Sequence, residues 1–378
     1  MPIKVLSVFG TRPDAIKMCP LVLKLASDPR FTSLVCVSAQ HREMLDSVLD
    51  IFSVKPDYDL NVMKPSQTLF QITTAVLSGL EKVLDDCKPD LVLVHGDTST
   101  AFVASLAAFY KQIPVGHVEA GLRTGNIYAP FPEEANRTLI ARTAALNFAP
   151  TTSNRANLEA EKAPGRIYVT GNTVIDAMSY TTRENYEFTD AALREVAGKK
   201  GVMPIFMTAH RRENLGAPLE AICRAARAFI DAVPNAELVY AVHPNPAVRN
   251  TVYPILSGHE RIHLTDPVDL LDAHNFMAKC RFVLTDSGGI QEEATALGVP
   301  TLVLRRETER GEGVETGILK LVGVDYDEIL SSCITLCTDE AQYRKMSRSA
   351  NPYGDGHACE RIADAIDEYF KEMRINAR

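Results

Sequence analysis

Residues 91–97 read LVLVHGD, an apolar strand pattern that ends in a carboxylate. The next such pattern, residues 113–119, reads IPVGHVE and ends in a carboxylate as well. In an open parallel sheet, ligands bind beyond the carboxyl ends of the strands. Asp97 and Glu119 are therefore candidates to share one pocket, where they can act as base, acid or cation stabiliser.

A carboxylate that follows a strand can also simply cap the next helix. Thr98 and the apolar stretch 101–109 leave both interpretations open for Asp97. Glu119 differs, because residues 121–125 read GLRTG, which is typical of a loop. A functional interpretation therefore fits Glu119 better than a structural one.

Working outward from these two strands, short apolar strands alternate with helical patterns along almost the whole chain. This alternation predicts an α/β fold with parallel sheets. Strands are predicted in a first run at 3–8, 34–38, 91–94, 115–118 and 146–148, and in a second run at 204–207, 237–241, 261–264, 282–284 and 301–304. Two runs of similar length predict two Rossmann-like domains that face a cleft.

The chain of 378 residues is longer than one ordinary hydrophobic core requires. We expect an N-terminal domain of residues 1–169 plus 358–378 and a C-terminal domain of residues 170–357. The sequence NPYGDG at 351–356 separates a last helix, which we expect to pack back onto the first domain.

Composition and charge exclude several classes of function. The net charge of −8 has the wrong sign for general nucleic-acid binding. No apolar run reaches the roughly 18 residues of a membrane span, and the N-terminus lacks a signal-peptide pattern. We therefore expect a cytoplasmic protein without nucleic-acid or membrane partners. The eight cysteines and nine histidines show no metal-binding spacing, so no metal is expected.

Two loops have the features of anion sites. Residues 9–14 follow the first strand, and there Arg12, with Lys17 one turn further along, suits an anion. Residues 285–289 read TDSGG between a buried strand and a helix. Gly288 and Gly289 allow a phosphate to approach backbone N–H groups, the hydroxyl of Ser287 adds a donor, and Glu293 could accept hydrogen bonds from a ribose diol. A helix cap with turn glycines is the alternative.

Three further side chains are candidates because of where they lie. Glu133 begins a helix, where acids are ordinary dipole partners, but Asp97 and Glu119 make a shared role plausible. His210 lies in the stretch AHRREN at 209–214, after the first strand of the second run. Together with its arginines it can neutralise a diphosphate, or it can belong to a solvated charged loop; His243 in VHPNP is a similar, weaker case. Carboxylates on one domain and a glycine-rich phosphate loop on the other suit a nucleoside-diphosphate sugar.

The assembled motifs closely resemble those of the non-hydrolysing UDP-N-acetylglucosamine 2-epimerases. The resemblance spans nearly the whole chain and rests on FGTRP (9–13), AQHREM (39–44), HGDT (95–98), HVEAGLR (117–123), PEEANR (132–137), TGNT (170–173), AHRREN (209–214), TDSGGIQEE (285–293) and NPYGDG (351–356). It implies a glycosyltransferase-B-like fold of two Rossmann-like domains. It also implies reversible conversion of UDP-N-acetylglucosamine to UDP-N-acetylmannosamine for cell-surface polysaccharide synthesis, by a homodimer that needs no cofactor. The implied route eliminates UDP to a 2-acetamidoglucal intermediate and then adds UDP back.

The resemblance also implies roles for individual residues. Asp97, Glu119, Glu133 and His210 match the catalytic positions of the family. Positions that contact the nucleotide sugar are matched by Arg12, Lys17, His243, Ser287, Gly288, Gly289, Glu293 and Arg310. Some members bind a second UDP-N-acetylglucosamine as an activator near the positions of Gln40, His41 and Arg42.

This chain departs from the family pattern at several positions. Asp14 replaces a glutamate, and Ala273 stands where an aromatic residue commonly contacts the uracil. Residues 305–311 carry extra charge, and Ser66 replaces an arginine of some activated members. Three other functions remain open from the residues alone: a UDP-sugar glycosyltransferase of the same fold, a 2-epimerase of another UDP-2-acetamido sugar, and a sugar-binding protein without catalysis.

Overall fold

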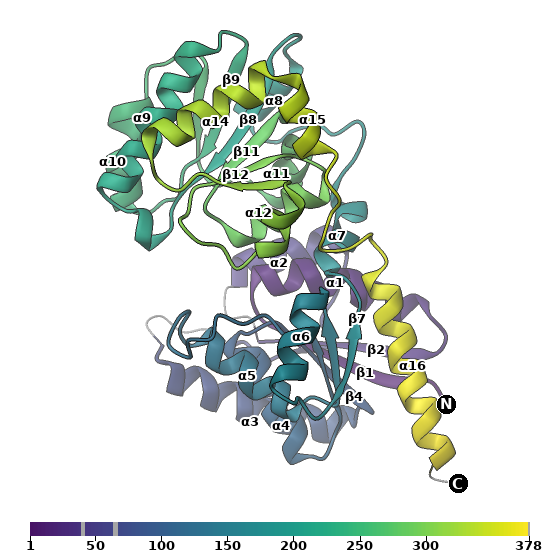
Figure 1. Cartoon of the computed structure of the whole chain (residues 1–378). Helices are drawn as coiled ribbons and strands as arrows, with labels where there is room; N and C mark the ends of the chain where they lie inside the picture. The colour runs from purple at the N-terminus through teal and green to yellow at the C-terminus, as the bar shows by residue number, and fades with distance from the viewer. Residues whose placement is uncertain (39–41, 63–66, 377–378) are drawn as a thin grey trace. The chain divides into compact units, whose positions relative to one another are not determined.

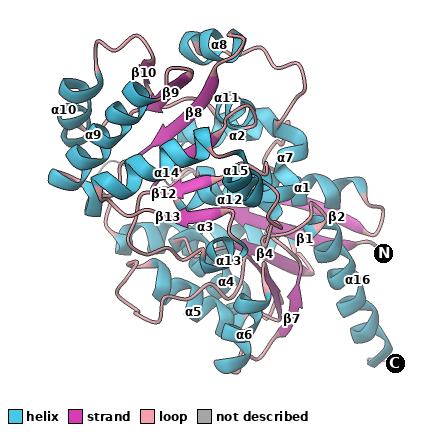
Figure 2. Cartoon of the chain, turned by 45° about the horizontal axis from the view of Figure 1, so that its top comes forward, coloured by secondary structure: helices cyan, strands magenta, loops and turns pink. Residues whose placement is uncertain are grey.

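A computed structural model describes residues 1–38, 42–62 and 67–376 of the chain. The chain divides into two compact units. Unit 1 contains Met1–Tyr180 and Tyr353–Arg378, and unit 2 contains Thr181–Pro352. Each unit has its own strands with helices around them (Figures 1 and 2), and each is described separately below.

The sheet of unit 1 is built from seven parallel strands of the described chain, in the order β3-β2-β1-β4-β5-β6-β7. Its strands are β1 (Ile3–Phe9), β2 (Phe31–Val37), β3 (Tyr58–Asp59), β4 (Leu91–His95), β5 (Val115–Val118), β6 (Leu146–Ala149) and β7 (Arg166–Val169). The central strands are buried along their length, as expected for a parallel sheet covered on both faces.

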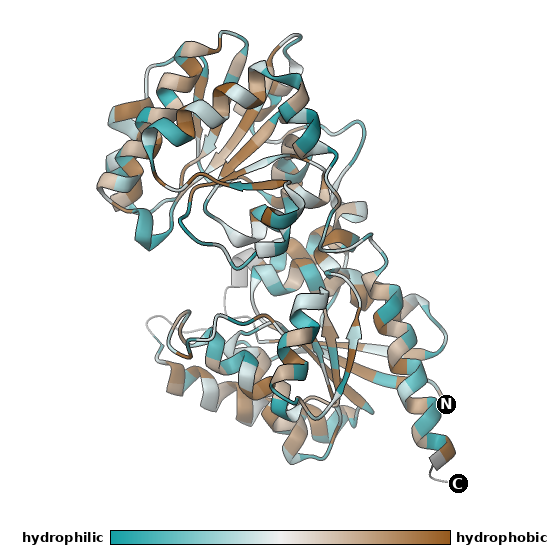
Figure 3. Ribbon diagram, viewed as in Figure 1, coloured by the Kyte–Doolittle hydropathy of each residue, from teal (hydrophilic) through white to brown (hydrophobic). Residues whose placement is uncertain are grey.

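The helices of unit 1 follow the strands in alternation. They are α1 (Arg12–Ser27), α2 (Arg42–Phe52), α3 (Leu69–Cys87), α4 (Ser99–Tyr110), α5 (Glu133–Thr143), α6 (Thr152–Ala160), α7 (Thr173–Thr181) and α16 (Ala358–Asn376). Apolar side chains of α3, α4 and α5 form one core with β1, β4 and β5, whereas α1 packs against β1, β2 and α16. Hydropathy colouring shows apolar strands and mixed helices (Figure 3).

Unit 2 repeats this architecture with six parallel strands, in the order β10-β9-β8-β11-β12-β13. The strands are β8 (Met203–Thr208), β9 (Ala236–Ala241), β10 (Ile262–Thr265), β11 (Phe282–Thr285), β12 (Thr301–Val303) and β13 (Leu319–Leu321). The helices are α8 (Ala191–Gly198), the 3-10 turn η1 (Arg212–Asn214), α9 (Ala217–Ala232), α10 (Pro246–Leu256), α11 (Leu270–Met277), α12 (Gly288–Ala296), α13 (Gly311–Thr316), α14 (Tyr326–Thr338) and α15 (Glu340–Ser347). Two apolar cores cover the sheet, one with α9, α10 and α14 and the other with α8, α11 and α12.

The α/β fold class with two Rossmann-like parallel sheets is confirmed, and so are all ten predicted strands. Three described strands are not among those ten: β3 and β13, in which two or three residues carry too little alternation, and β7. The second domain was expected to span residues 170–357, whereas unit 2 spans Thr181–Pro352. The reason is that the carboxylate of Asp176 in α7 accepts hydrogen bonds from the N–H groups of Ala358 and Cys359 at 3.2 and 2.9 Å, which ties α7 and the start of α16 to unit 1.

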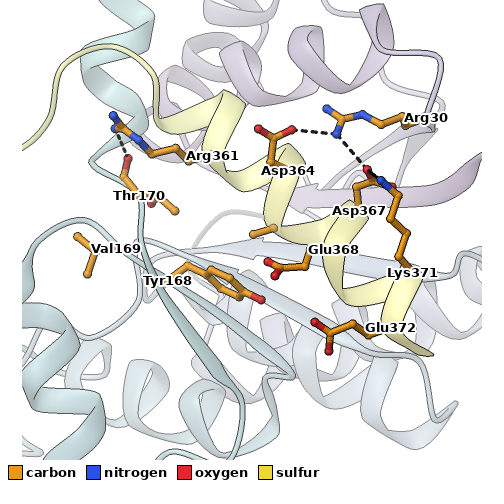
Figure 4. A pocket seen from close by; sticks show the side chains of 11 residues that line it. Arg30, Tyr168, Val169, Thr170, Arg361, Asp364, Asp367, Glu368, Lys371 and Glu372 are labelled. Atoms are coloured by element: carbon orange, nitrogen blue, oxygen red, sulfur yellow. Dashed lines mark hydrogen bonds and ion pairs between the residues drawn. The ribbon is translucent and has the colours of Figure 1, made fainter. Parts of the chain in front are cut away.

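The last helix packs back onto unit 1, as predicted, and its charged side chains attach it there. A pocket of about 670 Å³ lies along α16 beside β7 (Figure 4). Its charged groups pair with one another: Arg30 bonds Asp364 and Asp367, and Lys371 also pairs with Asp367. None of the candidate site residues lines this pocket. Within the described ranges, no helix is both long and apolar enough to cross a membrane.

Candidate functional site

In unit 1 the candidate residues gather where the strand order reverses. The chain leaves the central strand β1 toward β2 on one side, while β4 and β5 lie on the other side. Such a reversal point is where open α/β sheets place their ligands. Arg12 begins α1 directly after β1, Asp97 follows β4, and Glu119 follows β5. The expectation that Asp97 and Glu119 lie at one sheet edge is therefore confirmed.

Glu119 lies at the centre of a network of polar side chains. The ammonium group of Lys17 donates a hydrogen bond to its Oε2, and the amide nitrogen of Asn172 donates to the same oxygen at 3.1 Å. The Nε2 atom of His95 lies 3.6 Å from it. Lys17 was expected at the nucleotide, but it is 8% exposed and bonded to Glu119. The backbone of Glu119 has φ of 61°, a left-handed conformation that a β-branched residue would avoid.

The charges around Glu119 determine its ionisation. Burial by itself raises the pKa of Glu119, but Lys17 and His95 outweigh it and hold that pKa well below its usual range. His95 is 4% exposed, and its Nδ1 lies 3.3 Å from Oδ1 of Asp14. Burial lowers the pKa of His95, but Glu119 and Asp14 outweigh it and raise that pKa to about 9. Near neutral pH, an imidazolium therefore lies between two carboxylates.

Asp97 has a different environment from Glu119. Burial, together with the nearby carboxylates of Glu119, Asp14 and Glu133, raises the pKa of Asp97 despite the opposing charge of Arg137. Arg137 lies 2.9 Å from Oδ2 of Asp97. The cap of α4 is the hydroxyl of Thr98, which accepts from the N–H of Ala101. The helix-cap interpretation of Asp97 is therefore wrong.

Glu133 and its neighbour open α5. Glu133 is half-buried and close enough to influence Asp97. Glu134 has a structural task, because its Oε1 accepts hydrogen bonds from the N–H groups of Thr124 and Gly125, each at 3.1 Å. These bonds hold the loop after Glu119 against the start of α5.

Gly121 controls the path of that same loop. Its φ is 93°, and a Cβ atom there would lie 2.2 Å from the carbonyl oxygen of Asn154. We expect Gly121→Ala to lower the free energy of unfolding by about 1–3 kcal/mol, measured by chemical denaturation. Gly125→Ala is the matched control, since φ is 77° there but a Cβ meets nothing within 4 Å. Equal losses in both variants would show that backbone conformation, and not this contact, is responsible.

Unit 2 has its own reversal point, between β8 and β11. His210 follows β8, and Asp286 follows β11 and is fully buried. Oδ2 of Asp286 accepts hydrogen bonds from the N–H groups of His210 and Arg211, each at 2.8 Å, and from the amide of Asn214 at 2.9 Å. A single carboxylate oxygen thus organises the loop after β8.

The two candidate histidines of unit 2 lie together. The rings of His210 and His243 stack with centroids 5.0 Å apart and planes 9° apart. Nδ1 of His243 accepts from the N–H of Asn245 at 3.1 Å. Burial, together with the charges of His243 and Arg211, lowers the pKa of His210, and the opposing effect of Asp286 is smaller. Without a bound anion, His210 is therefore neutral at physiological pH.

The glycine-rich loop leads into α12. Ser287 occupies the N-cap position, but its side chain makes no capping hydrogen bond, so its hydroxyl is not used as a helix cap. A Cβ on Gly288 would lie 3.1 Å from the guanidinium carbon of Arg310, so that cation lies beside the helix N-terminus. Arg310 also pairs with Glu292 at 2.8 Å. Glu293 lies 3.3 Å from Nε2 of the buried His274.

Some site features were missed or fall outside the described structure. The sequence motifs contain His95, Asn172 and Asp286 but give no indication of their roles. Their burial beside charged groups is a signal that only the fold supplies. Gln40, His41 and Arg42, the predicted activator site, lie outside the residues whose side chains are described.

The chain has two Rossmann-like units. One has clustered carboxylates, and the other has a glycine-rich loop beside an arginine and two histidines. These features define a class of two-domain α/β enzymes that act on nucleotide-activated substrates. The model of the UDP-N-acetylglucosamine 2-epimerase family matches residues 23–367. The chain therefore belongs to the UDP-N-acetylglucosamine 2-epimerase family, and it is an enzyme of that family.

Individual relatives agree over nearly the full length. A UDP-N-acetylglucosamine 2-epimerase of Bacillus subtilis is 53% identical over 96% of this chain and 95% of its own. A solved structure of S. aureus MnaA with UDP is 48% identical and covers 98% of this chain and 97% of its own, with a TM-score of 0.87. A UDP-N-acetylglucosamine 2-epimerase of Neisseria meningitidis, bound to UDP-N-acetylglucosamine, is 46% identical over 97% of this chain and 100% of its own, also with a TM-score of 0.87.

Proposed function

We propose that this enzyme interconverts UDP-N-acetylglucosamine and UDP-N-acetylmannosamine through elimination and re-addition of UDP. A base removes the proton from C2 of the sugar while the bond from C1 to the diphosphate oxygen breaks. The electron pair of the C1–O bond leaves with UDP, and a C1–C2 double bond forms in 2-acetamidoglucal. UDP then attacks C1 again, and C2 receives a proton on the opposite face.

One observation carries this proposal: the two strand-end carboxylates of unit 1 have opposite preferences for a proton. Glu119 is held ionised by Lys17 and His95, whereas burial favours the protonated form of Asp97. Pairs of groups whose surroundings separate their pKa values in this way supply a base and an acid. Inversion at C2 needs both, one on each face of the sugar ring. The same anionic surroundings stabilise positive charge that develops at C1 as UDP leaves.

Unit 2 has groups that suit the diphosphate of UDP, which leaves and returns in this reaction. The N-terminus of α12, the glycines at 288 and 289 and the cation of Arg310 suit a diphosphate, which the helix dipole also favours. His210 and His243 add ring N–H donors at the same strand ends. Two relatives with solved structures contain UDP or UDP-N-acetylglucosamine, and their overall similarity supports the same ligand here. Ala273 is buried in α11 and offers no aromatic ring to the uracil of UDP.

Incubation with UDP-N-acetylglucosamine in heavy water tests the proposed route. We expect deuterium to appear at C2 in both epimers, because the proton returned to C2 comes from groups that exchange with solvent. Mass spectrometry and proton NMR of the sugar nucleotides provide the measurement. Formation of the manno epimer without deuterium at C2 would rule out elimination. Binding of UDP without any turnover would favour a non-catalytic sugar-binding protein.

Two finer parts of the expected function are also proposals. We infer a homodimer, supported by the strongly exposed aromatic side chains of Phe109 and Tyr110 at the end of α4. The family resemblance further supports a cytoplasmic enzyme that supplies cell-surface polysaccharide synthesis.

A further inference from the structure

A buried carboxylate oxygen in unit 2 faces a histidine across a gap. Asp286 is fully buried, and its Oδ2 atom accepts three hydrogen bonds from the loop after β8. Its other oxygen, Oδ1, is buried without a hydrogen-bond partner among the described residues. Nδ1 of His210 lies 3.7 Å from this oxygen. A buried carboxylate oxygen without a hydrogen-bond partner lowers the stability of the folded protein, so the position of Oδ1 requires a physical explanation.

The groups around His210 explain why its ring is not protonated and so does not donate a hydrogen bond to Oδ1 of Asp286. Asp286 after β11 favours the imidazolium, whereas His243 after β9 and the adjacent Arg211 oppose it, as does burial. The balance leaves the ring neutral. The side chain of His210 is nevertheless 37% exposed, so a ligand can reach it.

A diphosphate would reverse this balance. Two or more negative charges beside the ring favour the imidazolium strongly, because opposite charges at close range stabilise the charged form. The protonated ring then has two N–H donors. Nδ1–H can donate to Oδ1 of Asp286 and Nε2–H to a phosphate oxygen, and hydrogen bonds between two charged partners are the strong ones.

We propose that Asp286 is a positioning residue that makes His210 take up a proton from solvent when a diphosphate binds to unit 2. The inference rests on the proposed function of unit 2 as the nucleotide-binding unit. Asp286 fixes the ring through its backbone bonds and supplies the acceptor that the new Nδ1–H requires. No bond other than N–H forms in this step, and the proton comes from water or buffer. The affinity for a diphosphate thereby depends on pH through the pair of Asp286 and His210.

Titration calorimetry with UDP measures the proton uptake directly, since binding heats in buffers of different ionisation enthalpy reveal how many protons are exchanged. For the full-length protein at pH 8, we expect uptake of about one proton per UDP. His210→Asn should abolish this uptake, and Asp286→Asn should remove most of it. The asparagine oxygen can still accept the three loop hydrogen bonds. His259→Asn is the matched control, because His259 also pairs with an aspartate, Asp231, at 3.0 Å, but it precedes β10 at the opposite end of the sheet.

The pH dependence of affinity separates this role from a merely structural one. Asp286→Asn should weaken UDP binding more at pH 8 than at pH 5.5, because protonation of the His210 ring costs less free energy at the lower pH. Equal weakening at both pH values would overturn the proposal, as would UDP binding without proton uptake or uptake that survives in His210→Asn. Failure of the unchanged protein to bind UDP at any pH would instead overturn the proposed function of unit 2 and this inference with it.

Discussion

Glu119→Gln is expected to lower the rate of C2 deuterium exchange and of epimerisation by about 10²- to 10⁴-fold, the range for loss of a general acid or base. Glutamine keeps the size of the side chain, and its oxygen can still accept from Lys17 and Asn172. It cannot accept a proton from C2. The affinity for UDP should change little, since the groups that suit the diphosphate lie in unit 2. Initial rates by NMR, combined with calorimetry, measure the two quantities separately.

The control for this substitution is Glu161→Gln, which also removes a carboxylate of unit 1 that is paired with a cation, in this case an arginine. Glu161 bonds Arg123 at 2.8 Å, follows the last residue of α6, and is not among the described partners of Glu119. Exchange should remain near the rate of the unchanged protein. If Glu119→Gln exchanges C2 at the normal rate, Glu119 is not the base.

The sequence could predict the architecture and the strand-end acids because both depend on local patterns. Alternating apolar strands and helices identified both sheets, and the position of Asp97 and Glu119 after their strands placed them at one edge. Parallel topology does the rest, because the carboxyl ends of adjacent parallel strands meet at the same edge. The same argument placed His210 and the glycine-rich loop at one edge of the second sheet.

The charge network behind those acids could not be predicted in this way. Lys17 was assigned to the nucleotide because it follows a candidate phosphate loop, yet its ammonium group bonds Glu119, more than a hundred residues later in the chain. The ring of His95 points from the end of β4 toward Asp14 and Glu119. Whether a strand-end histidine is neutral or cationic depends on which carboxylates the fold brings to it. His117 illustrates the contrast: burial lowers its pKa to about 4, while it donates to the carbonyl of Gly96 at 2.7 Å.

His95 also makes a prediction for stability. An imidazole in the unfolded chain has a pKa near 6.5, whereas the folded protein raises that of His95 to about 9. Folding therefore favours the proton, so the stabilisation is fully present below about pH 6.5 and is lost as the pH rises through 9. This difference corresponds to roughly 3 kcal/mol. We expect the free energy of unfolding of unit 1 to fall by about that amount between these pH values, measured by hydrogen exchange of the buried amides of β4 and β5.

His95→Asn should remove this pH dependence, because asparagine is neutral throughout. His357→Asn is the control: His357 is highly exposed and pairs only at 3.4 Å with the exposed Glu360, so the slope should persist in that variant. Burial raises the thiol pKa of Cys19 and of Cys36 to about 12, so these thiols add a pH dependence only above about pH 8.5, where the thiols of the unfolded chain ionise, and they add it equally in both variants. A stability that stays flat from pH 6.5 to 9 in the unchanged protein would mean that His95 is neutral. Glu119 would then depend on Lys17 alone for its counter-charge.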